Sequence, residues 1–94
     1  MATFFMFGKY TVEAVQKITT DRTKKAVDII KKCGGEVKDI FALLGEHDLI
    51  FIADFPGHKE ALKASLSICR STGISFITAP AITVQEFDKL AADL

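Results

Sequence analysis

The sequence predicts an α+β domain with a four-stranded antiparallel sheet and the element order β-α-β-β-α-β, followed by a C-terminal helix. Apolar runs of strand length alternate with longer stretches in which apolar residues recur every three or four positions. Two of the strand-like runs are separated by the turn-forming segment Gly45-Glu46-His47-Asp48, as in a β-hairpin. Ninety-four residues are enough for one domain only, so residues 1–94 are expected to fold as a single unit.

The first strand is expected over residues 3–10. Side chains alternate between the two faces of a strand, so Phe5 and Phe7 would lie on one face and Phe4 on the other. The strand expected over residues 48–55 is apolar on both faces in the same way. Strands of this kind are covered on both sides.

Helical patterns follow the first strand. Thr11 can cap a short stretch in which Val12, Val15 and Ile18 share one face. A longer helix is expected from about residue 21 and ends at Gly34-Gly35, which suit a left-handed C-cap. The residues expected on its buried side, spaced i, i+3, i+4 and i+7, are Ala26, Ile29, Ile30 and Cys33.

The strand expected over residues 36–44 is charged where it begins and apolar where it ends. Charged residues are typical of sheet edges, where they discourage pairing with other chains. We therefore expect this strand at an edge. A strand over residues 74–81 completes the sheet.

Two further helices are expected in the second half of the chain. One covers residues 58–71, and the other covers residues 84–92 because Thr83-Val84-Gln85-Glu86 matches a capping box. The residues expected to pack the first helix are Leu62, Leu66 and Cys69, and the small residues Ala61, Ala64 and Ser65 are expected to allow close approach. Those expected to pack the second are Phe87 and Leu90.

Together these elements give the ferredoxin-like arrangement, with two helices on one face of the sheet. The first and third strands are apolar on both faces, so the other face of the sheet needs a partner. Hydrophobic residues make up 49% of the chain, and the mean hydropathy of +0.26 is high for a small monomer. We expect a homodimer or larger homo-oligomer whose sheets stack about 10 Å apart.

The charge balance limits the other partners. Twelve Lys and Arg residues equal twelve Asp and Glu residues, which disfavours nucleic acid and anionic membranes. No apolar run reaches the ~18 residues of a membrane span. Cys33 and Cys69 are too few for a disulfide framework, and we expect reduced, buried thiols in a cytoplasmic protein. After a second copy of the chain, the favoured partner is a small-molecule ligand.

His47 and Asp48 are the strongest local candidates for a catalytic site, because an imidazole can transfer protons and a carboxylate can orient it. The alternative is that Asp48 binds backbone amides of the turn while His47 lies at the surface. Lys9, Tyr10 and Asp54 are candidates for lining a ligand pocket beside the uncovered face; otherwise they are polar residues at strand ends.

No metal and no cofactor are expected. No Cys or His spacing resembles a zinc site. His47 and His58 bracket the third strand, which at ~3.3 Å per residue separates them by roughly 25–35 Å.

The hairpin Gly45-Glu46-His47-Asp48, the preceding Gly34-Gly35-Glu36-Val37-Lys38 and the closing Pro56 resemble the GYD-domain family. These are small bacterial and archaeal proteins named for a Gly-Tyr-Asp motif at this turn, where His47 replaces the usual Tyr. The similarity runs from the first strand to the Thr83–Glu86 cap. It implies a ferredoxin-like fold and a dimer of the dimeric α/β-barrel type. It carries over no catalytic residue, because the family has no assigned activity.

Two functions are compatible with this sequence. The first is a non-enzymatic homo-oligomeric module that binds a small apolar or aromatic ligand between sheet and helices or at the interface. The second is a cofactor-independent enzyme of the small-oxygenase type, with a pocket between the sheet and its partner and with His47 or Tyr10 as polar groups. The enzyme hypothesis predicts a closed cavity of roughly 300 Å³ or more with convergent polar groups. The binding-module hypothesis predicts that Phe and Ile side chains fill the uncovered sheet face without leaving a cavity.

Overall fold

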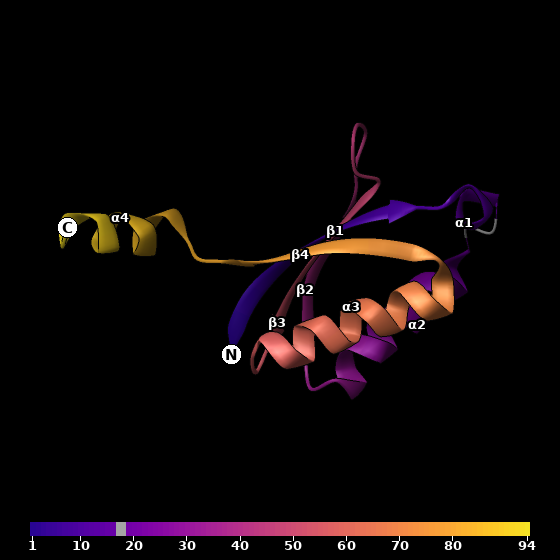
Figure 1. The fold of residues 1–94 in the computed structure, drawn as a ribbon, viewed down its shortest axis with the longest axis horizontal. Helices are drawn as coiled ribbons and strands as arrows, with labels where there is room; N and C mark the ends of the chain where they lie inside the picture. Colours follow the sequence, from indigo (N-terminus) through magenta and orange to yellow (C-terminus); the bar gives the residue numbers. More distant parts are fainter. Residues whose placement is uncertain (17–18) are drawn as a thin grey trace.

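The computed structural model describes residues 1–16 and 19–94. It contains a four-stranded sheet, two long helices on one of its faces, and short helices at either end of the sheet (Figure 1). The expected α+β fold is confirmed, while the expectation for Ile18 lies outside the described residues. The elements are β1 Ala2–Tyr10, α1 Val12–Gln16, α2 Thr20–Lys32, β2 Glu36–Ala42, β3 Leu49–Phe55, α3 His58–Thr72, β4 Ile74–Ala81 and α4 Val84–Ala92.

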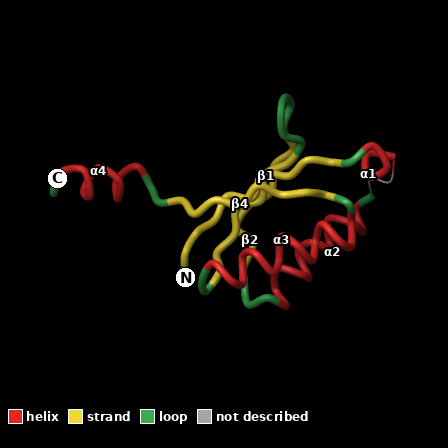
Figure 2. The backbone as a smooth tube through the Cα atoms, in the orientation of Figure 1, coloured by secondary structure: helices red, strands yellow, loops and turns green. Residues whose placement is uncertain are grey.

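The sheet has the strand order β2-β3-β1-β4, and each neighbouring pair is antiparallel. β2 lies at an edge, as its charged beginning predicted, and β4 forms the other edge. Figure 2 shows α2 and α3 together on one side of the sheet, with the loop between β2 and β3 projecting to the other side. One face of the sheet is thus left without a helix from the described part of the chain.

The hydrophobic core lies between the sheet and the two long helices. The strands supply large side chains and the helices supply mainly small ones, which lets the helices approach the sheet closely. Ala26 and Ile30 of α2 are buried, while Ile29 and Cys33 pack against the core in part, so the predicted inner side of α2 is confirmed. The fully buried members of the core include Phe4, Met6, Phe51, Phe55, Ala61, Ala64 and Ile68.

The predicted inner side of α3 is wrong. Leu62 and Leu66 are 58% and 71% exposed, and Cys69 is exposed as well. The buried side of the helix consists of Ala61, Ala64, Ser65 and Ile68, so the expected close approach through the three small residues is confirmed.

The reason for this difference is the short distance between α3 and β4. The Ser65 hydroxyl donates to the Ala61 carbonyl oxygen (2.8 Å) and lies 2.7 Å from the Thr78 hydroxyl of β4. A hydrogen bond of this length brings the two backbones together and leaves space for small side chains only. The leucines therefore occupy the outer side of α3.

The two cysteines were expected to be buried thiols. Cys69 is exposed, so the expectation is wrong for this residue, and Cys33 is half-buried.

α4 has the predicted bounds, and the Thr83 hydroxyl accepts from the Glu86 backbone N–H (3.1 Å) as a capping box requires. Its predicted packing on the same chain is wrong. Phe87 and Leu90 are each 60% exposed, and the helix has no buried residue. Figure 1 shows the cause, because the chain leaving β4 continues outward and carries α4 away from the rest of the domain.

Candidate functional site

The sheet surface opposite α2 and α3, here called the open face, carries large apolar residues on all four strands. The strand register sets Phe5 beside Ile52, and Phe7 between Ile50 and Ile77. The Phe5 and Phe7 rings are 6.4 Å apart. The large apolar residues of the open face are Phe5, Phe7, Phe41, Ile50, Ile52 and Ile77.

A hollow of about 380 Å³, here called the hairpin pocket, lies where the open face meets the loop between β2 and β3. β1 and β4 supply its floor and the loop supplies one wall. It brings together two of the predicted site residues, Lys9 and His47. Its lining residues are Phe7, Lys9, Glu46, His47, Ser75, Phe76 and Ile77.

Contacts with β1 hold the loop over the pocket. The Lys9 ammonium donates to the Glu46 carbonyl oxygen (2.9 Å), and the Asp48 backbone N–H donates to the Gly8 carbonyl oxygen (2.9 Å). The His47 ring packs on the Phe7 ring with centroids 5.2 Å apart. An ammonium group has three donors, so Lys9 retains two for a ligand. The pocket therefore combines an apolar floor with a cation and an imidazole at its rim.

Asp48 interacts with the backbone of β1. Its carboxylate accepts a hydrogen bond from the Tyr10 backbone N–H (2.8 Å). Its backbone carbonyl oxygen accepts a hydrogen bond from the Leu43 backbone N–H (2.8 Å). The alternative expectation for this residue was a bond to a backbone amide of the turn, whereas the amide it binds belongs to the neighbouring strand. This bond gives Asp48 a structural role. A catalytic role for His47 and Asp48 stays a prediction.

Replacing Asp48 with alanine should lower the free energy of unfolding by about 1–3 kcal/mol, because the partly buried Tyr10 N–H loses a charged acceptor. Urea unfolding followed by circular dichroism measures the loss. Asp48→Asn keeps an acceptor oxygen and should lose less than half as much. Glu46→Ala is the matched control, since this residue contacts Lys9 through its backbone oxygen. A loss as large in Glu46→Ala would contradict the assignment.

Tyr10 and Asp54 lie outside the hairpin pocket. The Arg22 guanidinium stacks over the Tyr10 ring, 4.8 Å from its centroid. Asp54 is near the opposite end of β3, where it accepts from the Thr3 hydroxyl (2.6 Å) and lies 3.6 Å from the Lys38 ammonium. The five predicted residues therefore do not form one site.

The two histidines lie on opposite faces of the sheet. His47 packs on Phe7 of the open face, whereas the His58 ring lies 5.8 Å from the ring of Phe4, which is part of the core. In residues 1–16 and 19–94, no group of three or more His, Cys, Asp or Glu side chains could hold a metal ion. None of the helices described is long and apolar enough to cross a membrane.

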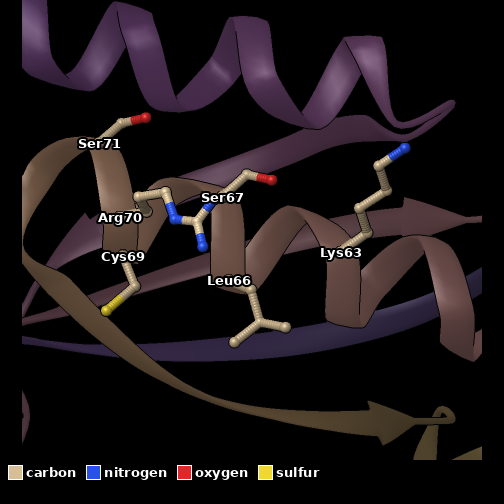
Figure 3. A pocket seen from close by; sticks show the side chains of 6 residues that line it. All are labelled: Lys63, Leu66, Ser67, Cys69, Arg70 and Ser71. Atoms are coloured by element: carbon tan, nitrogen blue, oxygen red, sulfur yellow. The ribbon is translucent and has the colours of Figure 1, made fainter.

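Sequence reasoning missed a second hollow, on the outer side of α3. It measures about 690 Å³ and is lined by residues of this helix alone. Figure 3 shows Leu66 and Cys69 on one flank of α3, the flank on which the chain continues into β4, and the side chain of Lys63 farther along the helix. The sequence pattern predicted Leu66 and Cys69 on the inside of the domain, whereas both lie on its outer side. The lining residues are Lys63, Leu66, Ser67, Cys69, Arg70 and Ser71.

A family model described as the GYD domain matches residues 4–91, nearly the whole chain. Comparison with curated proteins finds no match. Among solved structures, the Mycobacterium tuberculosis leucine response regulatory protein (LrpA) is similar, with a TM-score of 0.58 and 8% sequence identity. The similarity covers 87% of this chain and 51% of LrpA, so the chain spans about half the length of that protein. At this identity the likeness shows the fold alone.

Proposed function

The chain belongs to the GYD domain family, and from this premise we propose that it is a non-enzymatic homodimeric module that binds a small apolar or aromatic ligand. The main support for the proposal is the open face. Monomers rarely expose a contiguous apolar surface larger than a few hundred Å². This surface includes three phenylalanines, of which Phe41 is more than half exposed.

A second copy of the chain is the partner that best fits the open face. Two antiparallel sheets pack face to face at about 10 Å through interdigitating apolar side chains. A two-fold axis would place the same surface on both sides, as in most homodimers. This is the dimer of the α/β-barrel type that the family resemblance implies.

The hairpin pocket is the proposed ligand site. Its volume of about 380 Å³ falls within the usual range for small-molecule sites, roughly 300–1,000 Å³. The apolar side chains of Phe7 and Ile77 suit an aromatic or aliphatic group, and the Lys9 ammonium suits a carboxylate. The similar solved protein is named for its response to leucine, an aliphatic carboxylate. Small aromatic and aliphatic carboxylates are therefore the first ligands to test.

The alternative function is a cofactor-independent enzyme of the small-oxygenase type. The imidazole of His47 at an apolar pocket favours it, because such a group could accept a proton from a bound substrate. This function requires the second sheet to close the pocket. An enzyme would turn over a bound ligand, whereas a binding module returns it unchanged.

Light scattering after size exclusion, together with native mass spectrometry, tests the proposal. We expect a particle of twice the 10.3 kDa chain mass. A co-purified small molecule would appear as additional mass and would identify the ligand class. A monomer at micromolar concentration would overturn the proposed dimer.

Ligand binding has its own expected result. Leucine, phenylalanine and benzoate are the probes, and ligand-observed NMR measures their dissociation constants. Lys9→Ala should weaken carboxylate binding by about tenfold, because it removes the cation at the pocket rim. Lys59→Ala is the matched control, since Lys59 lies on α3. Equal affinities in the two variants would contradict the proposed site.

A further inference from the structure

We propose that α4 of one chain packs on the exposed apolar side of α3 in a second copy of the chain. Each helix has a row of uncovered apolar residues. The row on α3, here called the α3 stripe, consists of Leu62, Leu66 and Cys69. The row on α4, the α4 stripe, consists of Val84, Phe87 and Leu90. Neither belongs to the open face. Three side chains from each helix make a small contact, so it adds to the stacked sheets of the proposed dimer, on which it rests, and does not hold two chains together by itself.

α4 requires a covering surface to remain helical. The helix has nine residues, and isolated helices shorter than about 12–15 residues are only marginally stable in water. Its Thr83 cap stabilises the first turn, but all three residues of the α4 stripe are more than half exposed. Stability in short helices comes mainly from packing an apolar face. The α4 stripe is this face.

The described part of the same chain does not provide that surface. Figure 1 shows α4 beyond the end of β4, on an extended segment that points away from α2 and α3. Thr83 itself has an extended backbone, with ψ of 155°. The covering surface therefore has to come from another chain.

The α3 stripe matches α4 in shape and length. Its residues are spaced i, i+4 and i+7, which places them along one side of the helix. From Leu62 to Cys69 the stripe rises about 10 Å, and the α4 stripe rises about 9 Å, at 1.5 Å per residue. The hollow of about 690 Å³ in Figure 3 runs beside Leu66 and Cys69. Two helices can pack there side by side.

Charge favours this pairing over contacts between identical helices. α3 carries Lys59, Lys63 and Arg70 against one acidic residue, and helical spacing places these cations along one flank of the α3 stripe. α4 with its C-cap carries three acidic residues, Glu86, Asp88 and Asp93, against one lysine. Pairing α3 with α3, or α4 with α4, would bring like charges together. Pairing α4 with α3 brings opposite charges together.

Disulfide cross-linking of the full-length protein tests the contact. Cys69 is the natural thiol on the α3 stripe, and Cys33→Ser removes the other cysteine. Val84→Cys and Leu90→Cys are each introduced separately in this background. These positions lie at opposite ends of the α4 stripe, so one of them meets Cys69 whichever direction α4 runs. Gln85→Cys, on the other side of α4, is the matched control.

After mild oxidation, we expect a disulfide-linked dimer on a non-reducing gel for Val84→Cys or Leu90→Cys. The control should give less than about one tenth of this yield, and Cys69→Ser should abolish the product. A monomer with an internal disulfide would overturn the proposal, because α4 would then be folded onto its own chain. Absence of the linked dimer in both variants, or an equal yield in the control, would also overturn it.

Charge reversal in the cross-linking background tests the pairing independently. Lys63→Glu with Arg70→Glu should slow formation of the linked dimer about tenfold, since these cations flank Leu66. Adding Glu86→Lys and Asp88→Lys should restore the rate. An unchanged rate in the first variant, or no restoration in the second, would overturn the assignment of α4 to this side of α3.

Discussion

Replacing Ile52 with aspartate is expected to convert the homodimer into a folded monomer. Ile52 lies on β3, next to Phe5 of β1 and Asp39 of β2, so it is near the middle of the open face. In the proposed dimer the new carboxylate would be buried between two sheets without a cation, at a cost of several kcal/mol. Because every 1.4 kcal/mol changes affinity tenfold, we expect the dissociation constant to rise by about 10³ or more.

The folded state itself should persist in this variant. Ile52 is only half-buried in the single chain, so its replacement stays in contact with water when the monomer is free. The core on the other face of β3 is unchanged. Light scattering gives the mass, and circular dichroism gives the fold. Ile52→Val keeps an apolar side chain and should remain dimeric, whereas a dimer in Ile52→Asp would place the interface on another surface.

The positions of the strands and helices along the chain could be predicted from the sequence, because the signals for them are local. Alternation of side chains along β1 and β3 identified two apolar faces, and the caps at Thr83 and Gly34 marked helix ends. The open face followed from the same alternation, since two helices can cover only one side of a sheet. The resemblance to the GYD-domain family is confirmed by the match over residues 4–91.

The orientation of α3 could not be predicted in this way. Both sides of this helix carry apolar residues at helical spacing, small ones on one side and leucines on the other. Size alone favoured Leu62 and Leu66 as the buried pair. The actual choice depends on the distance between α3 and β4, which the Ser65–Thr78 contact of 2.7 Å keeps short. That distance is a property of the assembled domain and has no local signal.

Only part of the candidate site could be predicted, and the reason is similar. Lys9 and His47 share the hairpin pocket because the loop between β2 and β3 folds against the end of β1. The remaining lining comes from β4, whose register places Ile77 beside Phe7 and Ser75 beside Lys9. Register between distant strands is set by the whole sheet, so the sequence could not identify these residues as neighbours.

Replacing Phe51 with alanine is expected to have the largest effect on stability. Phe51 is next to Ile52 in β3 but faces α2 and α3, where it is only 1% exposed. Its ring meets the Phe76 ring edge-on with centroids 5.6 Å apart. Loss of a buried phenylalanine costs about 3–5 kcal/mol through lost burial and the cavity that remains. The total free energy of unfolding of a small domain is roughly 5–15 kcal/mol.

Urea unfolding at a fixed chain concentration measures this loss, because the stability of a dimer depends on concentration. Phe51→Leu keeps most of the apolar volume and should lose less than half as much. The fraction of Phe51→Ala that remains folded should still dimerise, since the open face is unaltered. Adjacent residues of one strand thus separate the two properties: Phe51 determines stability and Ile52 determines association. A loss below about 1 kcal/mol would contradict the placement of Phe51 in the core.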